Sequence, residues 1–201
     1  MVIQTHMELY HGLVQNLRYS ENQRWTKLLE KKLGSDFRAI ENGLPARTID
    51  LDYEKDQSVN GLTTFESALS DNLPLDWIII FLGTNDTKTK FDRSPDKMIE
   101  GTEKYLDLID MYSLNSKILL VAPVPVDENI TNNSYTPNLW IGTSQKTRQF
   151  SILLENLTLK RKTEFLDLSK IAQVSQVDGI HFDLDTQEAI ARVLSKIIIK
   201  I

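Results

Sequence analysis

The sequence predicts a three-layer α/β/α sandwich, in which helices cover both faces of a central parallel sheet. Short apolar runs alternate with amphipathic segments along the 201 residues, a pattern typical of strands separated by helices. The segment Leu75–Leu82 is apolar on both faces, which suits a central parallel strand. No repeat, low-complexity tract or linker interrupts this pattern. We therefore expect one domain over residues 1–201.

The strand candidates are short runs of apolar residues. They lie at 2–3, 37–41, 75–82, 117–121 and 164–168. The carboxyl ends of parallel strands meet at one edge of a sheet, and open α/β sheets bind their ligands there. Functional residues are therefore expected in the loops that follow these strands and in the turn before the last helix.

The helix candidates lie between the strands. They span 24–34, 61–71, 95–112, 143–159 and 186–199. In the first, Trp25 and three leucines recur at helical spacing, and Gly34 supplies a C-terminal stop. Ser94 and Pro95 suit the cap and the first turn of the third helix. The prolines and asparagines of 123–138 predict a long loop.

The composition excludes several classes of function. A net charge of −5 without a basic block argues against a nucleic-acid partner. The absence of cysteine excludes disulfides, thiolate metal sites and a cysteine nucleophile, and it fits a reducing compartment. No run resembles an export signal or a bilayer-spanning helix. We therefore expect a cytoplasmic protein that has no membrane partner.

The first candidate site is the turn FLGTNDTK, residues 81–88, directly after the predicted central strand. A neutral amide fixed there, that of Asn85, can donate a hydrogen bond to a developing oxyanion. Removing one such donor costs roughly 3–4 kcal/mol in known enzymes. Asparagine also commonly stabilises its own turn, and the tetrapeptide alone does not decide between these two roles.

The second candidate is NGLPART, residues 42–48, which also follows a predicted strand. Gly43 lets the backbone approach a ligand and offers its N–H as a second oxyanion donor. Arg47 either pairs with an acidic neighbour or orients the loop. A lone glycine in a loop is usually only a turn residue, so this signal is weak by itself.

The third candidate is VDGIHFD, residues 177–183, just before the last helix. The Asp178 carboxylate can reach Nδ1 of His181 and fix its tautomer, which leaves Nε2 to act as a general base. A lone histidine is more often structural, but the Asp-Gly-x-His turn favours catalysis. No cluster of ligands indicates a metal site, and no motif indicates a cofactor.

Together these segments resemble the SGNH (GDSL-type) ester hydrolases, a family with a flavodoxin-like α/β/α fold. The resemblance covers nearly the whole chain and is strongest to the bacterial arylesterase and acyltransferase branch. It is carried by RW (24–25), ENGLPART (41–48), NGL (60–62), LPLDWIIIFLGTNDTK (73–88) and DGIHF (178–182). It implies that His181 is the base, Asp178 its orienting partner, and Gly43 and Asn85 oxyanion donors. It also implies a small acyl ester as substrate, and it leaves both a monomer and a homo-oligomer open.

The first block of the family departs from this pattern. The family has Gly-Asp-Ser-(Leu/Ile) after the first strand, with a glycine four residues beyond the serine. Aligning on Gly12 puts His6 and Met7 at the Gly and Asp positions, and Glu8 at the position of the nucleophilic serine.

Three interpretations of this departure remain. The chain is a homologue without a nucleophile that binds its ligand without cleaving it, or another group, Glu8 or Ser20, substitutes for the serine. Alternatively, residues 1–11 do not represent the natural protein. Ser20 fits better as a helix cap than as a nucleophile. We expect the chain as printed to be inactive or very weak as an esterase.

Overall fold

The computed structural model describes residues 2–4, 9–12, 15–52, 59–112, 115–131 and 138–200, with side chains from Tyr19 onward. Its main feature is a five-stranded parallel sheet in the order β4-β1-β5-β6-β7. The strands are β4 (Glu41–Gly43), β1 (Val2–Gln4), β5 (Trp77–Phe81), β6 (Lys117–Ala122) and β7 (Glu164–Asp167). A separate antiparallel hairpin pairs β2 (Leu9–Gly12) with β3 (Gln15–Arg18).

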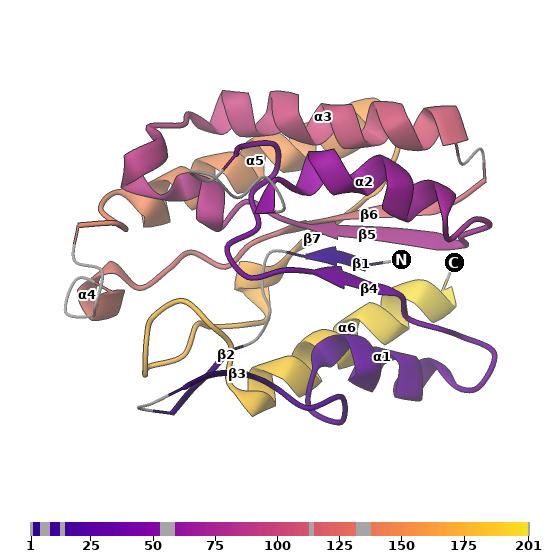
Figure 1. Cartoon of the computed structure of the whole chain (residues 1–201), viewed down its shortest axis with the longest axis horizontal. Coiled ribbons are helices and arrows are strands. Elements are labelled where there is room, and N and C mark those ends of the chain that lie inside the picture. The colour runs from indigo at the N-terminus through magenta and orange to yellow at the C-terminus, as the bar shows by residue number, and fades with distance from the viewer. Residues whose placement is uncertain are drawn as a thin grey trace.

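Helices form a layer on each side of this sheet (Figure 1). One layer holds α2 (Gly61–Ser70), α3 (Pro95–Tyr112) and α5 (Thr143–Arg161), and the other holds α1 (Trp25–Leu33) and α6 (Leu184–Lys200). The short helix α4 (Glu128–Thr131) lies in the loop after β6. The expected three-layer α/β/α fold with a parallel sheet is confirmed.

Side chains of the central strands alternate between the two cores. In β5, Ile78 and Ile80 pack in the core with α2, α3 and α5, whereas Ile79 and Phe81 pack in the core with α1 and α6. Neighbouring residues of a strand point to opposite faces, so a strand covered on both sides must be apolar at every position. This is why the sequence of β5 shows no polar face.

The strand expected at 37–41 begins later than predicted, at Glu41, and extends into the predicted loop to Gly43. The N–H of Ala39 donates to the Glu30 carboxylate at 2.6 Å, and the N–H of Phe37 donates to the Gly34 carbonyl. These two backbone groups are therefore satisfied by α1 and its terminal turn, and β1 pairs with β4 only over Glu41–Gly43. An apolar run predicts a strand but does not reveal such competing partners.

Three further details differ from the sequence predictions. The hairpin β2–β3 was not predicted, and the loop expected over 123–138 contains α4. Ser20 does not cap α1, because Arg24 occupies the cap position and the Ser20 hydroxyl donates to the Gln23 side chain.

Ser94 does act as predicted, since its hydroxyl accepts the N–H of Lys97. Within the described ranges, no helix is both long and apolar enough to cross a bilayer.

Replacing Leu120 by alanine should lower the free energy of unfolding by about 2–5 kcal/mol. Leu120 lies in β6 and is fully buried in the core beneath α3 and α5, so its loss leaves a cavity. The matched control is Leu159→Ala on α5, where the side chain is 76% exposed and the change should stay within about 0.5 kcal/mol. Chemical denaturation of both variants measures the difference, and equal losses would contradict this assignment of the core.

Candidate functional site

The turn before α6 holds an aspartate and a histidine in direct contact. Oδ2 of Asp178 lies 2.6 Å from Nδ1 of His181, while Oδ1 accepts the backbone N–H groups of Ile180 (2.8 Å) and His181 (2.9 Å). One carboxylate therefore orients both the imidazole ring and the turn that carries it. A base acting on a substrate from this arrangement would use Nε2.

The environment of Asp178 keeps this carboxyl group ionised. Burial by itself would raise the pKa of Asp178, but the hydrogen bond and charge of His181, together with the two backbone N–H donors, lower it to about 2. The group is thus a carboxylate at neutral pH, and it can stabilise an imidazolium when one forms.

Backbone contacts fix this turn against the rest of the edge. The Asp127 N–H donates to the Gly179 carbonyl at 2.8 Å, and the Ser175 N–H donates to the His181 carbonyl at 2.7 Å. Gly179 has φ +72°, and a Cβ there would lie 2.8 Å from the Asp127 carbonyl oxygen, so the turn requires glycine. The Phe182 ring stacks on Phe81, the last residue of β5, at 6.3 Å between centroids. The histidine is thereby held beside the carboxyl end of β5.

Asn85 begins a short 3-10 helix (Asn85–Thr87) just beyond β5 and is almost completely buried. Its side-chain Nδ2 donates to the backbone carbonyl of Arg47 at 3.1 Å. A primary amide carries two N–H donors, and this bond uses one of them. The Asn85 amide therefore stabilises the loop after β4, which contains Arg47, and not its own turn.

Gly43 is the last residue of β4, in register with Gln4 of β1. Arg47, four residues later, is 1% exposed, and its Nη1 donates to the carbonyl (2.7 Å) and side-chain oxygen (3.0 Å) of Asn42. No carboxylate pairs with Arg47 among the described residues. Of its two expected roles, therefore, the structure supports orientation of the loop. Ala46, just before it, adopts φ +58°, a conformation that costs about 1–2 kcal/mol for a non-glycine residue.

A buried ionic network, which the sequence did not reveal, is centred on Asp86, the residue directly after Asn85. The Asp86 carboxylate accepts the Ile49 N–H at 3.1 Å and pairs with Arg93 at 2.6 Å, and Arg93 also pairs with Asp50. Lys104 completes the network by pairing with Asp50 at 2.7 Å. Complete burial raises the pKa of Asp86 to about 7, although Arg93 opposes the shift. The only sequence signal was an acidic residue directly after Asn85.

A second ion pair, also not predicted, joins the start of α1 to β4. Nε and Nη2 of Arg24 donate to the two carboxylate oxygens of Glu41 at 2.9 and 2.7 Å, and Arg24 is 7% exposed. Such a two-pronged pair fixes direction as well as distance. It therefore holds the strand that ends in Gly43 against the first helix.

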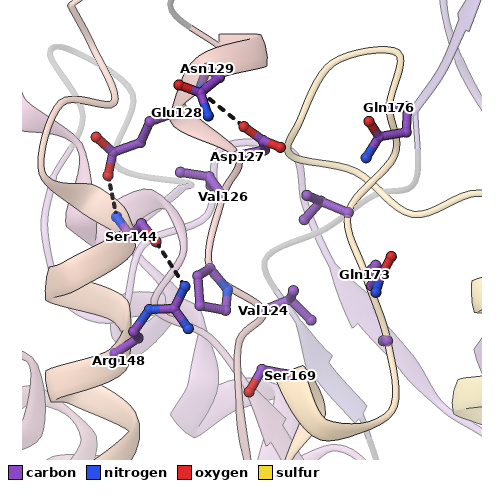
Figure 2. A pocket seen from close by; sticks show the side chains of 13 residues that line it. Val124, Val126, Asp127, Glu128, Asn129, Ser144, Arg148, Ser169, Gln173 and Gln176 are labelled. Carbon is purple, nitrogen blue, oxygen red and sulfur yellow. Dashed lines mark hydrogen bonds between the residues drawn. The ribbon is translucent and has the colours of Figure 1, made fainter.

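A polar cavity of about 440 Å³ lies between the loop after β6, the start of α5 and the segment after β7 (Figure 2). Glu128 closes one side by accepting the N–H groups of Gly142 (2.9 Å) and Ser144 (2.7 Å), which caps α5. Figure 2 also shows Arg148 donating to the Ser144 hydroxyl. Neither Asp178 nor His181 lines this cavity. Asp127 does line it, and the Asp127 N–H donates to the carbonyl of Gly179, which lies between Asp178 and His181 in the sequence.

Glu8, at the expected nucleophile position, lies outside the described residues, as do His6 and Met7. For metal ions, the described side chains contain no group of three or more histidine, aspartate or glutamate residues placed to bind one.

Similar solved structures share the fold of this chain. No protein-family model matches the sequence, and no curated protein matches it. Among solved structures, the native aryl esterase of M. smegmatis matches with a TM-score of 0.88 and 27% identity, over 99% of this chain and 97% of that one. A carbohydrate acetylesterase from Sinorhizobium meliloti matches with a TM-score of 0.86 and 29% identity, over 99% and 98%.

A member of the lipolytic G-D-S-L family from Veillonella parvula shares the fold at 12% identity, with a TM-score of 0.66 over 100% of this chain and 97% of that one. The expected SGNH-hydrolase fold is thus confirmed, and the similar structures at 27–29% identity are esterases.

Asp178→Asn should change how stability depends on pH. The folded pKa of Asp178, about 2, lies below its ordinary value of 3.8, so the carboxylate adds stability above about pH 4 that is lost as pH falls through about 2. Between about pH 5 and pH 2, the stability difference between parent and variant should shrink by about 2 kcal/mol. Denaturant unfolding at several pH values measures this, with the exposed Asp183→Asn as control. A difference that is constant with pH would contradict it.

Proposed function

We propose that this chain is an SGNH-type protein of the ester-hydrolase class, whose cleft takes a small carboxylic acyl ester. The observation that carries the proposal is the 2.6 Å contact between Asp178 and Nδ1 of His181. This pair lies at the same edge of the sheet as Asn85 and Gly43. The fold and the esterase activity named for the aryl esterase and the acetylesterase support the same class.

In a chain that carries the serine, the reaction would proceed through an acyl-enzyme. Nε2 of His181 would take the serine proton as the oxygen attacks the ester carbonyl, and Asp178 would stabilise the resulting imidazolium. The Asn85 amide and the Gly43 N–H would donate to the carbonyl oxygen as it becomes negative. The imidazolium would then protonate the leaving alcohol, and water would release the acid by the same steps.

The printed chain has Glu8 where that serine is expected. Loss of the nucleophile from a catalytic triad lowers kcat by on the order of a millionfold, a figure measured for subtilisin. The remaining residues would still bind an ester, so the second candidate function is a ligand-binding domain that uses the same cleft. The Glu8 position is the observation that favours this candidate.

The printed chain should hydrolyse p-nitrophenyl acetate no faster than the buffer, because it lacks the serine hydroxyl. The measurement is initial release of p-nitrophenolate, with His181→Ala as the matched control. Hydrolysis above background that disappears in His181→Ala would overturn this expectation and indicate a substituting nucleophile. Saturable binding of an ester without turnover would instead favour the ligand-binding candidate.

The triple variant His6→Gly, Met7→Asp, Glu8→Ser should gain ester hydrolysis, because it restores the missing block while leaving the rest of the site unchanged. Its rate should depend on His181 and fall to background when His181→Ala is added. The gain should be sensitive to a serine-directed fluorophosphonate, which labels the new serine and can be followed by intact mass. If the triple variant folds but stays inactive and unlabelled, the alignment of Glu8 with the nucleophile is wrong.

A further inference from the structure

The outer face of α5 carries exposed apolar side chains where a surface helix usually carries charges. Ile152 is 62% exposed and Leu159 is 76% exposed. α5 packs against α3 and covers β6 and β7, the strands at one end of the sheet, so its outer face points away from the rest of the molecule (Figure 1). The α5 face, as we call it, consists of Gln145, Arg148, Gln149, Ile152, Glu155, Asn156 and Leu159, all of which are exposed.

Three of these side chains form a line along the middle of the α5 face. Gln145, Ile152 and Leu159 are seven residues apart, which is about two helical turns, so they point in the same direction. Large apolar side chains repeated at this spacing form the seam along which two helices pack in a coiled coil. The middle of the α5 face therefore suits a second helix laid along it, with Ile152 at the centre.

The flanking side chains indicate which helix fits. Arg148 and Glu155 lie on one side of the line, and Gln149 and Asn156 lie on the other. If a second α5 lies antiparallel, with the two copies of Ile152 facing each other, each flank meets the same flank of the partner. Arg148 then lies opposite Glu155 of the partner subunit, and Gln149 lies opposite Asn156 of the partner subunit. Opposite charges and matching amides thus meet twice, which is the self-complementarity that a two-fold interface requires.

Both charges are available for such a contact. Arg148 donates to the Ser144 hydroxyl at 3.4 Å, a bond that uses one of the five N–H groups of a guanidinium. Among the described side chains, neither Arg148 nor Glu155 takes part in an ion pair. The next basic residues along α5, Lys160 and Arg161, are instead paired with acidic residues of α3. The α5 face therefore presents one unpaired charge of each sign.

We infer that the α5 face is a self-association surface, and that its partner is a second copy of this chain related by a two-fold axis near Ile152. The contact is one helix long and thus smaller than the roughly 800 Å² per partner of a standard interface, so we expect a dissociation constant on the order of 100 µM. At low micromolar concentration the chain is then mainly monomeric, and Leu159→Ala remains a valid surface control for unfolding. The inference requires no nucleophile and is independent of the proposed function.

Sedimentation equilibrium of the full chain, from about 5 µM to about 1 mM, tests the surface. The average mass should rise with concentration from that of one chain toward that of two. Ile152→Asp should weaken association at least about tenfold, because the two-fold axis brings both introduced carboxylates together in an apolar contact. The matched control is Ile199→Asp on α6, where the side chain is 64% exposed and association should not change. A monomer at 1 mM, or equal association of Ile152→Asp and the parent, would overturn the inference.

Two charge reversals test the antiparallel pairing, at low ionic strength where surface charges are least screened. Arg148→Glu and Glu155→Arg should each self-associate at least about threefold more weakly than the parent, because like charges then meet on both sides of the axis. An equimolar mixture of the two variants should recover the association of the parent, since every pair is again opposite in sign. Replacing the first variant by Arg192→Glu, a reversal at an exposed position of α6, should give no such recovery. A mixture that associates no better than its components would refute the antiparallel two-fold contact.

Discussion

The buried carboxylate of Asp86 holds together the loops on which the candidate site depends. It accepts the Ile49 N–H from the loop after β4 and pairs with Arg93, which lies just before α3. Because Asp86 follows Asn85 directly, these contacts also fix the turn after β5. Removing one partner of such a buried pair leaves an uncompensated charge, which typically costs several kcal/mol. The geometry of this edge therefore depends on this ionic network.

The charges of the site are arranged in two ways. Where a carboxylate serves orientation, as Asp178 does for His181 and Glu41 does for Arg24, it meets its partner at 2.6–2.9 Å. Arg47 differs, since it makes its contacts to carbonyl, amide and hydroxyl oxygens only.

The sequence predicted the features that depend on local pattern. The α3 boundaries and the Ser94 contact follow from Ser-Pro at a helix start, and the Asp178–His181 contact follows from three-residue spacing in a turn. It did not predict the Arg93–Asp86 and Arg24–Glu41 pairs, because a charged residue carries no local sign of its tertiary partner. The start of β4 was misjudged for a similar reason, since the Glu30 carboxylate that binds the Ala39 N–H lies nine residues earlier.

The described contacts of the candidate site do not depend on the expected serine block. Asn85, Arg47, Asp178 and Gly179 each take part in contacts that hold loops together, so their structural role does not require a nucleophile. A serine in the first block would contribute a reacting oxygen but, among the described residues, no contact in these networks depends on one. These contacts would therefore be needed for the same folded edge whether or not the chain catalyses a reaction. For this reason the candidate base and donors are evidence about the proposed class of the protein, whereas the triple variant after β1 tests whether such a chain turns over a substrate.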